Sequence, residues 1–370
     1  MKVLLLNKIP LSLYVHLPWC ETQCPYCDFS ITTDPVNGND AKLAEAIIED
    51  INQSKDLIAG RKFKTIYFGG GTPSLASTES IKNILDSIKD TFSSKEAEIT
   101  LEMNPSDVSE DRIDELLIAG INRISLGIQS YNNQELQALG RNHDRESAIK
   151  ATQVMQGINS TIDLIYGIEK QTLKSFTANL ERIIQSNINH LSLYQLSIEP
   201  NTIFYKKELK LPGEEEIEKI ELIAKDLLKK NGYKQYEVSS WSKPGYESQH
   251  NMNYWQFGDF LGVGPGSHSK ISSQEGIIRF RKIKPLEGYI KNQRSTDLKN
   301  IADNDLDMDL AMNLLRIKNG LQQQDVTTAL PASFLKKYQR GVDEGLLLKN
   351  RIGATQKGYR FLNETIQLFF

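Results

Sequence analysis

Residues 14–29 of this 370-residue chain read YVHLPWCETQCPYCDF, and the stretch holds all three cysteines, Cys20, Cys24 and Cys27. Their spacing is C-x3-C-x2-C, directly after a short β-rich run at Ser12–His16. Three thiolates on one short loop can each bind one iron of a cubane cluster. The spacing therefore predicts a [4Fe–4S] cluster whose fourth iron has no protein ligand and can chelate the amino and carboxylate groups of a small molecule.

Two other interpretations of the cysteines remain open at this point. A zinc site would need a fourth ligand, which His16 or His268 would supply, and the three cysteines can also be buried free thiols. A disulfide framework is not indicated, because the cysteine count is odd and all three lie close together. The clustering favours one metal site in a reducing compartment.

The first two hundred residues alternate short β-rich runs with amphipathic helices, which is the pattern of parallel strands joined by right-handed crossovers. The sequence thus predicts an α/β fold built on an incomplete (β/α)6 barrel. Ligands of such sheets sit beyond the carboxyl ends of the strands. After Ser12–His16, the further strands are expected at Thr65–Phe68, Glu98–Met103, Arg123–Ile128, Thr161–Tyr166 and Leu191–Leu196.

Three parts are expected along the chain: the barrel at 1–200, a Gly- and aromatic-rich extension at 201–300, and a C-terminal α+β winged-helix-like unit at 301–370. The extension begins with a charged helix at 213–232 and has a short strand at Gln235–Ser239. The C-terminal unit is expected to contain helices at Asp303–Lys318, Gln322–Leu330 and Ser333–Glu344, then a hairpin at Leu346–Gly353 and a final helix from Thr355.

Composition limits the classes of function. Hydrophobic residues are 39% of the chain and charged residues 25%, as in ordinary globular proteins, and the formal net charge of −3 shows no basic excess for nucleic acid. The densest basic stretch, Arg279 to Lys284, is expected on the solvated face of a strand. The apolar run Met1–Asn7 is too short for a signal peptide or a membrane span. We therefore expect a cytoplasmic protein, at most peripheral to a membrane.

A glycine run follows the second expected strand, where Gly69, Gly70 and Gly71 precede Thr72. Glycines at a strand end allow positive φ and a close approach of the backbone to a ligand. Exposed backbone groups there can grip the methionyl end of S-adenosylmethionine (SAM), the small molecule that an open cluster iron suits. A plain tight βα turn is the alternative. The run is not a P-loop, because no Gly-Lys-Ser/Thr follows.

Polar residues also occur in or just after later strands, where buried strands rarely carry them: Glu102, Gln129, Arg141 and Asp163. A buried carboxylate is costly unless it is paired or bound to a ligand. These carboxylates can hold the ribose hydroxyls or the ammonium group of SAM, and Arg141 can pair with its carboxylate. Salt bridges across the barrel mouth are the equal alternative.

These motifs resemble those of radical SAM proteins related to oxygen-independent coproporphyrinogen III oxidase. The resemblance covers nearly the whole chain and is carried by residues 14–27, then by Gly69–Ser74, Gly127–Ser130, Leu139–Asn142 and Ile162–Gly167. The oxidase branch has an N-terminal extension and a further cysteine two positions after the third. Here Phe29 stands at that position.

The second branch is the HemW heme chaperone family, whose H-N-x-x-Y-W motif is matched by His250–Trp255, followed by a similar stretch at Asp259–Ser269. This resemblance implies heme binding and delivery to heme-requiring, membrane-associated respiratory enzymes, with an electron donor for the retained cluster. It implies that Cys20, Cys24 and Cys27 bind the cluster. It also implies a SAM site lined by Tyr14, Tyr26, Gly70, Gly71, Thr72, Glu102, Gln129, Arg141 and Asp163, with an adenine contact near Ser197.

Histidine is a common heme ligand. His250 is the first candidate among the five histidines, because Tyr254 and Trp255 offer flat apolar contacts to a porphyrin. His268 is the next candidate, while His16 is expected to shape the cluster surroundings; a lone histidine is also often structural.

Three hypotheses follow: a heme chaperone with cluster and SAM, a radical enzyme acting on a porphyrinogen, and an interaction protein with a structural cluster. Phe29 and the His250–Trp255 motif favour the first.

Overall fold

The computed structural model describes residues 9–34, 36, 39–89, 93–273, 276–292, 299–300 and 303–370. The apolar run Met1–Asn7 lies outside these residues. Within them, one mixed sheet of twelve strands forms the centre of the molecule, in the order β12-β11-β10-β9-β1-β2-β3-β4-β5-β6-β8-β7.

The six expected strands all form, and each pairs in parallel with the next. Nearly every residue of β1 is buried, as is usual for parallel strands covered on both faces. Their bounds are β1 (Leu11–Leu17), β2 (Phe63–Gly70), β3 (Ser93–Met103), β4 (Arg123–Gln129), β5 (Ser160–Tyr166) and β6 (His190–Gln195).

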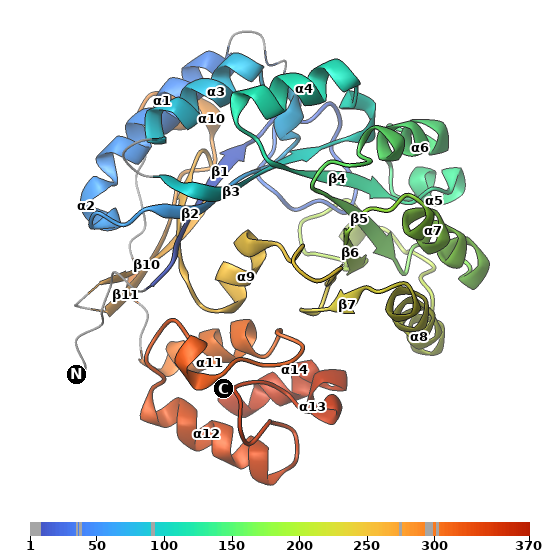
Figure 1. Cartoon of the computed structure of the whole chain (residues 1–370), viewed down its shortest axis with the longest axis vertical. Helices are drawn as coiled ribbons and strands as arrows, with labels where there is room; N and C mark the ends of the chain where they lie inside the picture. Colours follow the sequence, from blue (N-terminus) through green and yellow to red (C-terminus); the bar gives the residue numbers. More distant parts are fainter. Residues whose placement is uncertain are drawn as a thin grey trace.

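Helices cover the outer side of the curved sheet (Figure 1). Side chains of Ser77, Ser109 and Thr172 cap α3, α4 and α7 by accepting hydrogen bonds from backbone N–H groups of the first turn. The helices of this half are α1 (Asn39–Gln53), α2 (Lys55–Ile58), α3 (Thr78–Ile88), α4 (Glu110–Ala119), α5 (Asn133–Ala138), α6 (Arg145–Val154), α7 (Leu173–Gln185) and α8 (Glu214–Lys230).

Later parts of the chain extend the same sheet at both edges. β9 (Asp259–Val263) pairs in parallel with β1, and β10 (His268–Ser273), β11 (Gly276–Arg281) and β12 (Lys299–Asn300) follow it antiparallel. On the other edge, β8 (Ser240–Ser242) and β7 (Lys234–Gln235) replace the single strand expected at Gln235–Ser239. α9 (Gln249–Trp255) lies on the concave side of the sheet (Figure 1), and α10 (Leu286–Ile290) packs against α1.

The C-terminal residues build a second apolar core around Leu310, Leu314 and Phe334. The helix expected at Gln322–Leu330 is wrong: only a 3-10 turn, Gln323–Asp325, forms there. The hairpin expected at Leu346–Gly353 reduces to single bridges, Leu347 with Ala354 and Leu321 with Ile352. The helices of this part are α11 (Asp303–Leu314), α12 (Ala332–Asp343), α13 (Gln356–Arg360) and α14 (Leu362–Ile366).

The basic stretch at 279–284 is only partly solvated, which corrects the sequence-based expectation. The Lys282 ammonium is buried and lies 2.7 Å from the Asp50 carboxylate, and Arg279 pairs with Asp309 at 2.8 Å. Arg279 thus ties β11 to α11, and Lys282, the residue after β11, ties the chain there to α1. None of the helices in the described residues is both long and apolar enough to cross a bilayer.

Candidate functional site

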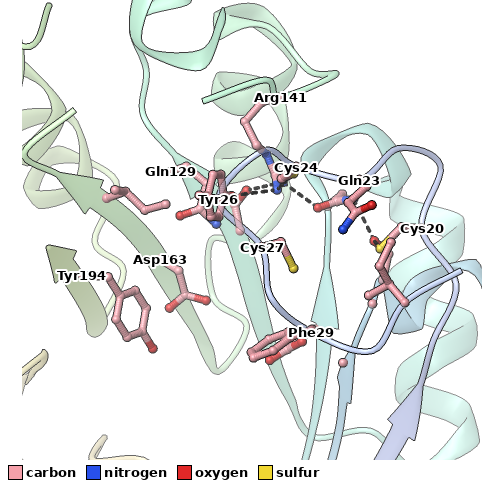
Figure 2. A pocket seen from close by; sticks show the side chains of 18 of the residues that line it. Cys20, Gln23, Cys24, Tyr26, Cys27, Phe29, Gln129, Arg141, Asp163 and Tyr194 are labelled. Atoms are coloured by element: carbon pink, nitrogen blue, oxygen red, sulfur yellow. Dashed lines mark hydrogen bonds between the residues drawn. The ribbon is translucent and has the colours of Figure 1, made fainter. Parts of the chain in front are cut away.

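A cavity of about 520 Å³ opens where β2 to β6 end, and the cysteine loop forms one of its walls. Figure 2 shows Cys20, Cys24 and Cys27 in that wall, with Asp163 and Tyr194 projecting from the strands across from them. Most of the residues predicted for a SAM site line this cavity: Tyr26, Gly70, Gly71, Thr72, Glu102, Gln129, Arg141 and Asp163. Ser197 lines it as well.

Backbone contacts fix the shape of the cysteine loop. The Cys20 N–H donates to the carbonyl of Thr32 at 2.9 Å, and the Cys27 N–H donates to the carbonyl of Cys24 at 3.0 Å. Trp19 is fully buried beneath the loop. The Phe204 N–H donates to the Pro25 carbonyl at 2.9 Å, so the segment after β6 also holds the loop in place.

Two polar side chains touch the thiols. Thr72 Oγ1 donates to Cys20 Sγ at 3.7 Å, and the Arg141 guanidinium donates to Cys24 Sγ at 3.5 Å. Burial raises the pKa of Cys20 despite the Thr72 hydrogen bond, and burial raises the pKa of Cys27 to about 11. Thiolates are the form that binds iron. At Cys20 the Thr72 hydroxyl and the Arg141 guanidinium oppose the effect of burial and so stabilise the thiolate form in part.

Asn104 connects these two contacts, and sequence analysis did not identify it. Its side-chain N–H₂ donates to Thr72 Oγ1 at 3.1 Å, and its side-chain oxygen accepts from Arg141 at 2.6 Å. A continuous hydrogen-bonded path thus runs from Cys20 through Thr72, Asn104 and Arg141 to Cys24. The one sequence signal was its position just after β3, at the strand end where Glu102 was recognised.

The donor set fits a cubane cluster with a small-molecule chelate. No three His, Cys, Asp or Glu side chains within the described ranges converge on a single metal ion. A cubane does not require such convergence, because each thiolate binds its own iron. The opposite wall adds two buried polar atoms that have no hydrogen-bond partner among the described residues, Gln129 Oε1 and Asp163 Oδ1. A bound polar ligand would satisfy them.

The glycine run packs against the cysteine loop. Gly70 has φ +112°, and a Cβ there would lie 2.6 Å from the His16 ring. A Cβ on Gly71 would lie 2.4 Å from the Trp19 carbonyl oxygen, and the Gly71 N–H donates to the Leu17 carbonyl at 2.8 Å. The close approach expected at these glycines is therefore made, at least in part, to the protein's own backbone.

Glu102 is the acidic group whose pKa is most relevant to this cavity. Burial, with the nearby Asp163 carboxylate, raises its pKa to about 7 although the Tyr67 hydroxyl donates to it at 2.8 Å. Burial likewise raises the pKa of Asp163, against a hydrogen bond from Ser125 at 2.7 Å. Two half-buried carboxylates that disfavour each other's charge would be stabilised by a cationic ligand.

Two of the predicted site residues, Tyr14 and His250, are not among the described residues that line the cavity. The Tyr14 ring stacks on Tyr67 at 6.3 Å between centroids, and its hydroxyl contacts His16 Nδ1 at 3.2 Å. The His250 ring stacks on Tyr67 at 4.8 Å, and its Nδ1 lies 2.7 Å from Thr65 Oγ1. Both rings therefore contact Tyr67, which itself lines the cavity.

The fold and this site define a class of protein. The model of the radical SAM superfamily matches residues 14–183, which include the end of β1, the cysteine loop and the strands β2 to β5. The solved coproporphyrinogen III oxidase (HemN) of Escherichia coli, a radical SAM enzyme, shares the fold with a TM-score of 0.79, covering 100% of this chain and 92% of that one. The identity of 23% makes this a likeness of fold.

Curated relatives give the family. The heme chaperone HemW of Haemophilus influenzae is 38% identical, that of Buchnera aphidicola from Acyrthosiphon pisum 37%, and that of Escherichia coli K12 34%. Each match covers 97% of this chain and 98% of the relative. The chain belongs to the HemW heme chaperone family of radical SAM proteins, as the His250–Trp255 motif predicted.

Proposed function

We propose that this protein is a heme chaperone: it binds heme and passes it to heme-requiring acceptor proteins, including respiratory enzymes at the membrane. The observation that carries the proposal is the identity of 34–38% to heme chaperones over almost the full length of both chains. Phe29 supports it, because the oxidase branch that the motifs resemble has a cysteine at that position.

The cavity beside the cysteine loop is the proposed site of a [4Fe–4S] cluster and SAM. When bound, the cluster and SAM would supply one-electron reductive chemistry, for which an electron donor is needed. Cys20, Cys24 and Cys27 would hold the irons, and Arg141 and Thr72 would donate hydrogen bonds to two of these sulfurs. Glu102, Asp163 and Gln129 would receive the cationic and hydroxyl groups of SAM, and Gly70 and Gly71 would shape the wall between them.

The described elements also support the proposed organisation. The arc of β1 to β6 fits an incomplete (β/α)6 barrel over residues 1–200, with an extension at 201–300 and a winged-helix-like unit at 301–370. The helices of this last unit have an apolar core in which Phe334 and Phe369 stack at 4.8 Å. We infer a cytoplasmic location, since a reducing compartment suits the three thiols.

The alternative function is oxygen-independent coproporphyrinogen III oxidation, which the fold permits. Anaerobic reconstitution of the full chain with iron and sulfide, followed by two assays, separates the two functions. We expect a saturable Soret shift on heme titration and no turnover of coproporphyrinogen III in the presence of SAM and a reductant. Turnover above background without saturable heme binding would overturn the chaperone proposal.

A further inference from the structure

The five histidines of the chain divide sharply by exposure, and all five lie in described residues. Four are buried, with exposed fractions of 5% for His16, 6% for His143, 1% for His190 and 2% for His250. His268 alone is exposed. An axial ligand of a cargo heme has to be reachable from solvent, because the porphyrin enters and leaves.

The buried imidazoles are also engaged in the interior. His16 Nε2 donates to the Ser30 carbonyl at 2.7 Å, and His143 Nε2 donates to the Ile128 carbonyl at 3.0 Å. The Nε2 atom of His250 has no hydrogen-bond partner within the described part of the chain, but the rings of Tyr67 and Tyr254 lie 4.8 and 5.0 Å from the His250 ring. A porphyrin needs the space that these rings fill, so ligation by His250 would require these rings or α9 to move.

His268 stands in a cationic setting at the start of β10. It is directly paired across the strands with Arg281 of β11, and both residues are exposed. Burial lowers the pKa of His268, and the positive charges of Arg281, Lys284 and Arg279 lower it further. The imidazole makes no hydrogen bond to another described residue. Arg279 is already paired with Asp309, whereas the exposed Lys284 makes no ion pair with another residue that the structure describes.

The same corner touches the cysteine loop. Gly266, two residues before His268, lies so close to Ser30 that a Cβ on it would be 2.8 Å from Ser30 Cβ, and 3.6 Å from Lys284 Cγ. Phe29, the neighbour of Ser30, is 56% exposed and lines the mouth of the cavity. We call His268, Arg281, Lys284 and Phe29 the His268 patch.

We propose that heme binds at the His268 patch, with the His268 imidazole as an axial ligand of the iron and the propionates on Arg281 and Lys284. The inference deepens the proposed chaperone function and rests on it. Imidazole is a common protein ligand of heme iron. Guanidinium and ammonium groups form charge-assisted hydrogen bonds with carboxylates. Phe29 supplies an apolar surface for the macrocycle beside the cluster loop.

Porphyrin titrations of the anaerobically reconstituted full chain distinguish ligation of the iron by His268 from the contacts of the propionates with Arg281 and Lys284. Hemin binding is followed by the Soret band, and binding of metal-free protoporphyrin IX by fluorescence. His268→Ala should lower hemin affinity by about tenfold or more and leave protoporphyrin affinity unchanged, because only hemin has an iron to ligate. Arg281→Gln with Lys284→Gln should lower the affinity for both porphyrins. Added imidazole should restore the hemin spectrum of His268→Gly.

All of these side chains are exposed, so the variants should fold, and the cluster absorbance with its response to SAM checks this. Lys229→Gln with Lys230→Gln, on the exposed end of α8, is the charge-matched control and should bind like the wild type. If the variants of His268 and of Arg281 with Lys284 bind hemin as tightly as the wild type, the heme site proposed at the His268 patch is wrong, but the chaperone function is not. Hemin binding that is lost in His250→Ala but kept in the variants of His268, Arg281 and Lys284 also overturns the assignment to the His268 patch. Absence of saturable hemin binding by the wild type overturns both.

Discussion

Arg141 donates a 2.6 Å hydrogen bond to the side-chain oxygen of Asn104. Because Asn104 in turn donates to Thr72, it joins Arg141 and Thr72, the two side chains that contact the thiols. Arg141 also donates to the Gly127 carbonyl at 3.1 Å, so the end of β4 orients the guanidinium. A charge-assisted hydrogen bond of this kind is worth about 1.5–3 kcal/mol. The position of the cysteine loop therefore depends on the ends of β3 and β4 as well as on the loop itself.

Asn104→Ala should weaken cluster retention, because Thr72 and Arg141 both lose the partner that orients them. We expect a several-fold faster loss of iron and sulfide on exposure to a chelator, measured by the decay of the cluster absorbance. Asn142→Ala is the matched control, since Asn142 donates to Glu21 at the exposed rim of the loop. Equal decay rates for the two variants would contradict the role assigned to Asn104.

Gly70→Ala and Gly157→Ala should differ greatly although both glycines have positive φ, +112° and +83°. At Gly157 no atom of a described residue lies within 4 Å of the added Cβ, so only backbone strain of about 1 kcal/mol is expected. At Gly70 the Cβ meets the buried His16 ring as well. Thermal unfolding should show a shift several times larger for Gly70→Ala, together with loss of cluster loading; similar shifts would refute the packing argument.

SAM binding should strengthen as pH rises through about 7. Because burial raises the pKa of Glu102 to about 7, its charge, which would attract the cationic groups of SAM, appears only above that pH. The affinity should rise by up to about tenfold between pH 6 and 8, following the ionised fraction. Isothermal titration across this range should give a flatter profile for Glu102→Gln, and an unchanged slope would rule out Glu102 as the titrating group.

The same pKa makes a prediction about the SAM-free protein. In the unfolded chain Glu102 loses its proton near its ordinary pKa of 4.5, whereas the folded chain keeps the proton until about 7. The unfolded state thus binds fewer protons between these values, and this group's contribution to the free energy of unfolding decreases as pH rises through that window. Denaturant titrations should show this decrease, and Glu102→Gln should remove it.

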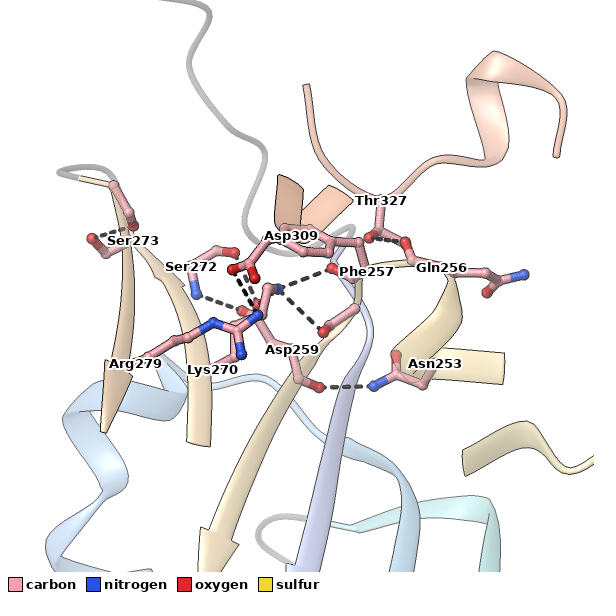
Figure 3. Close-up of polar contacts among 12 residues, drawn as sticks. Asn253, Gln256, Phe257, Asp259, Lys270, Ser272, Ser273, Arg279, Asp309 and Thr327 are labelled. Carbon is pink, nitrogen blue, oxygen red and sulfur yellow. Dashed lines mark hydrogen bonds and ion pairs between the residues drawn. The ribbon is translucent and has the colours of Figure 1, made fainter. Parts of the chain in front are cut away.

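Asp259→Asn should be among the most destabilising single substitutions at the junction of β9 and β10. The fully buried Asp259 carboxylate lies 2.7 Å from Arg61 and 2.9 Å from Lys270, and the latter contact is shown in Figure 3. Burial alone would raise its pKa, yet Lys270 and Arg61 hold the pKa below its ordinary value. Neutralising it leaves two cations buried, at a cost of about 3–5 kcal/mol.

Chemical denaturation measures that cost, and Asp86→Asn provides the control. Asp86 pairs with Lys82 on the exposed face of α3, where an i,i+4 pair is worth only about 0.3–0.5 kcal/mol. If Asp259→Asn lowers the free energy of unfolding by less than about 1 kcal/mol, water reaches the ion pairs of Asp259 with Arg61 and Lys270.

The sequence predicted the six parallel strands well, because buried β-rich runs such as Thr65–Phe68 contrast with the helices between them. The segment after residue 255 was harder. Its strand β9 pairs with β1, far away in sequence, and Gly262 and Gly264 interrupt the apolar pattern. Around Gln322–Leu330, β-branched residues and Pro331 end the helical pattern that the apolar spacing suggested.

At the site, residues at strand ends were predictable because the ends of parallel strands meet. Glu102, Gln129 and Asp163 were recognised as polar residues in apolar strands, and they line one cavity. Asn104 was missed, since an asparagine after a strand is as common in turns. The basic residue Lys282 gave no sign of being buried, because its partner Asp50 lies 232 residues away.

β1 lies between β2 and β9, so the strand that leads into the cysteine loop has its second neighbour nearly 250 residues later in the chain. During synthesis on a ribosome, the N-terminal strand emerges early but keeps one edge open until the residues of β9 have been translated. Since Gly264 packs against the backbone of His16, the nascent loop acquires its final support only then. An iron–sulfur cluster can therefore enter a fully supported cysteine loop only after β9 has been translated.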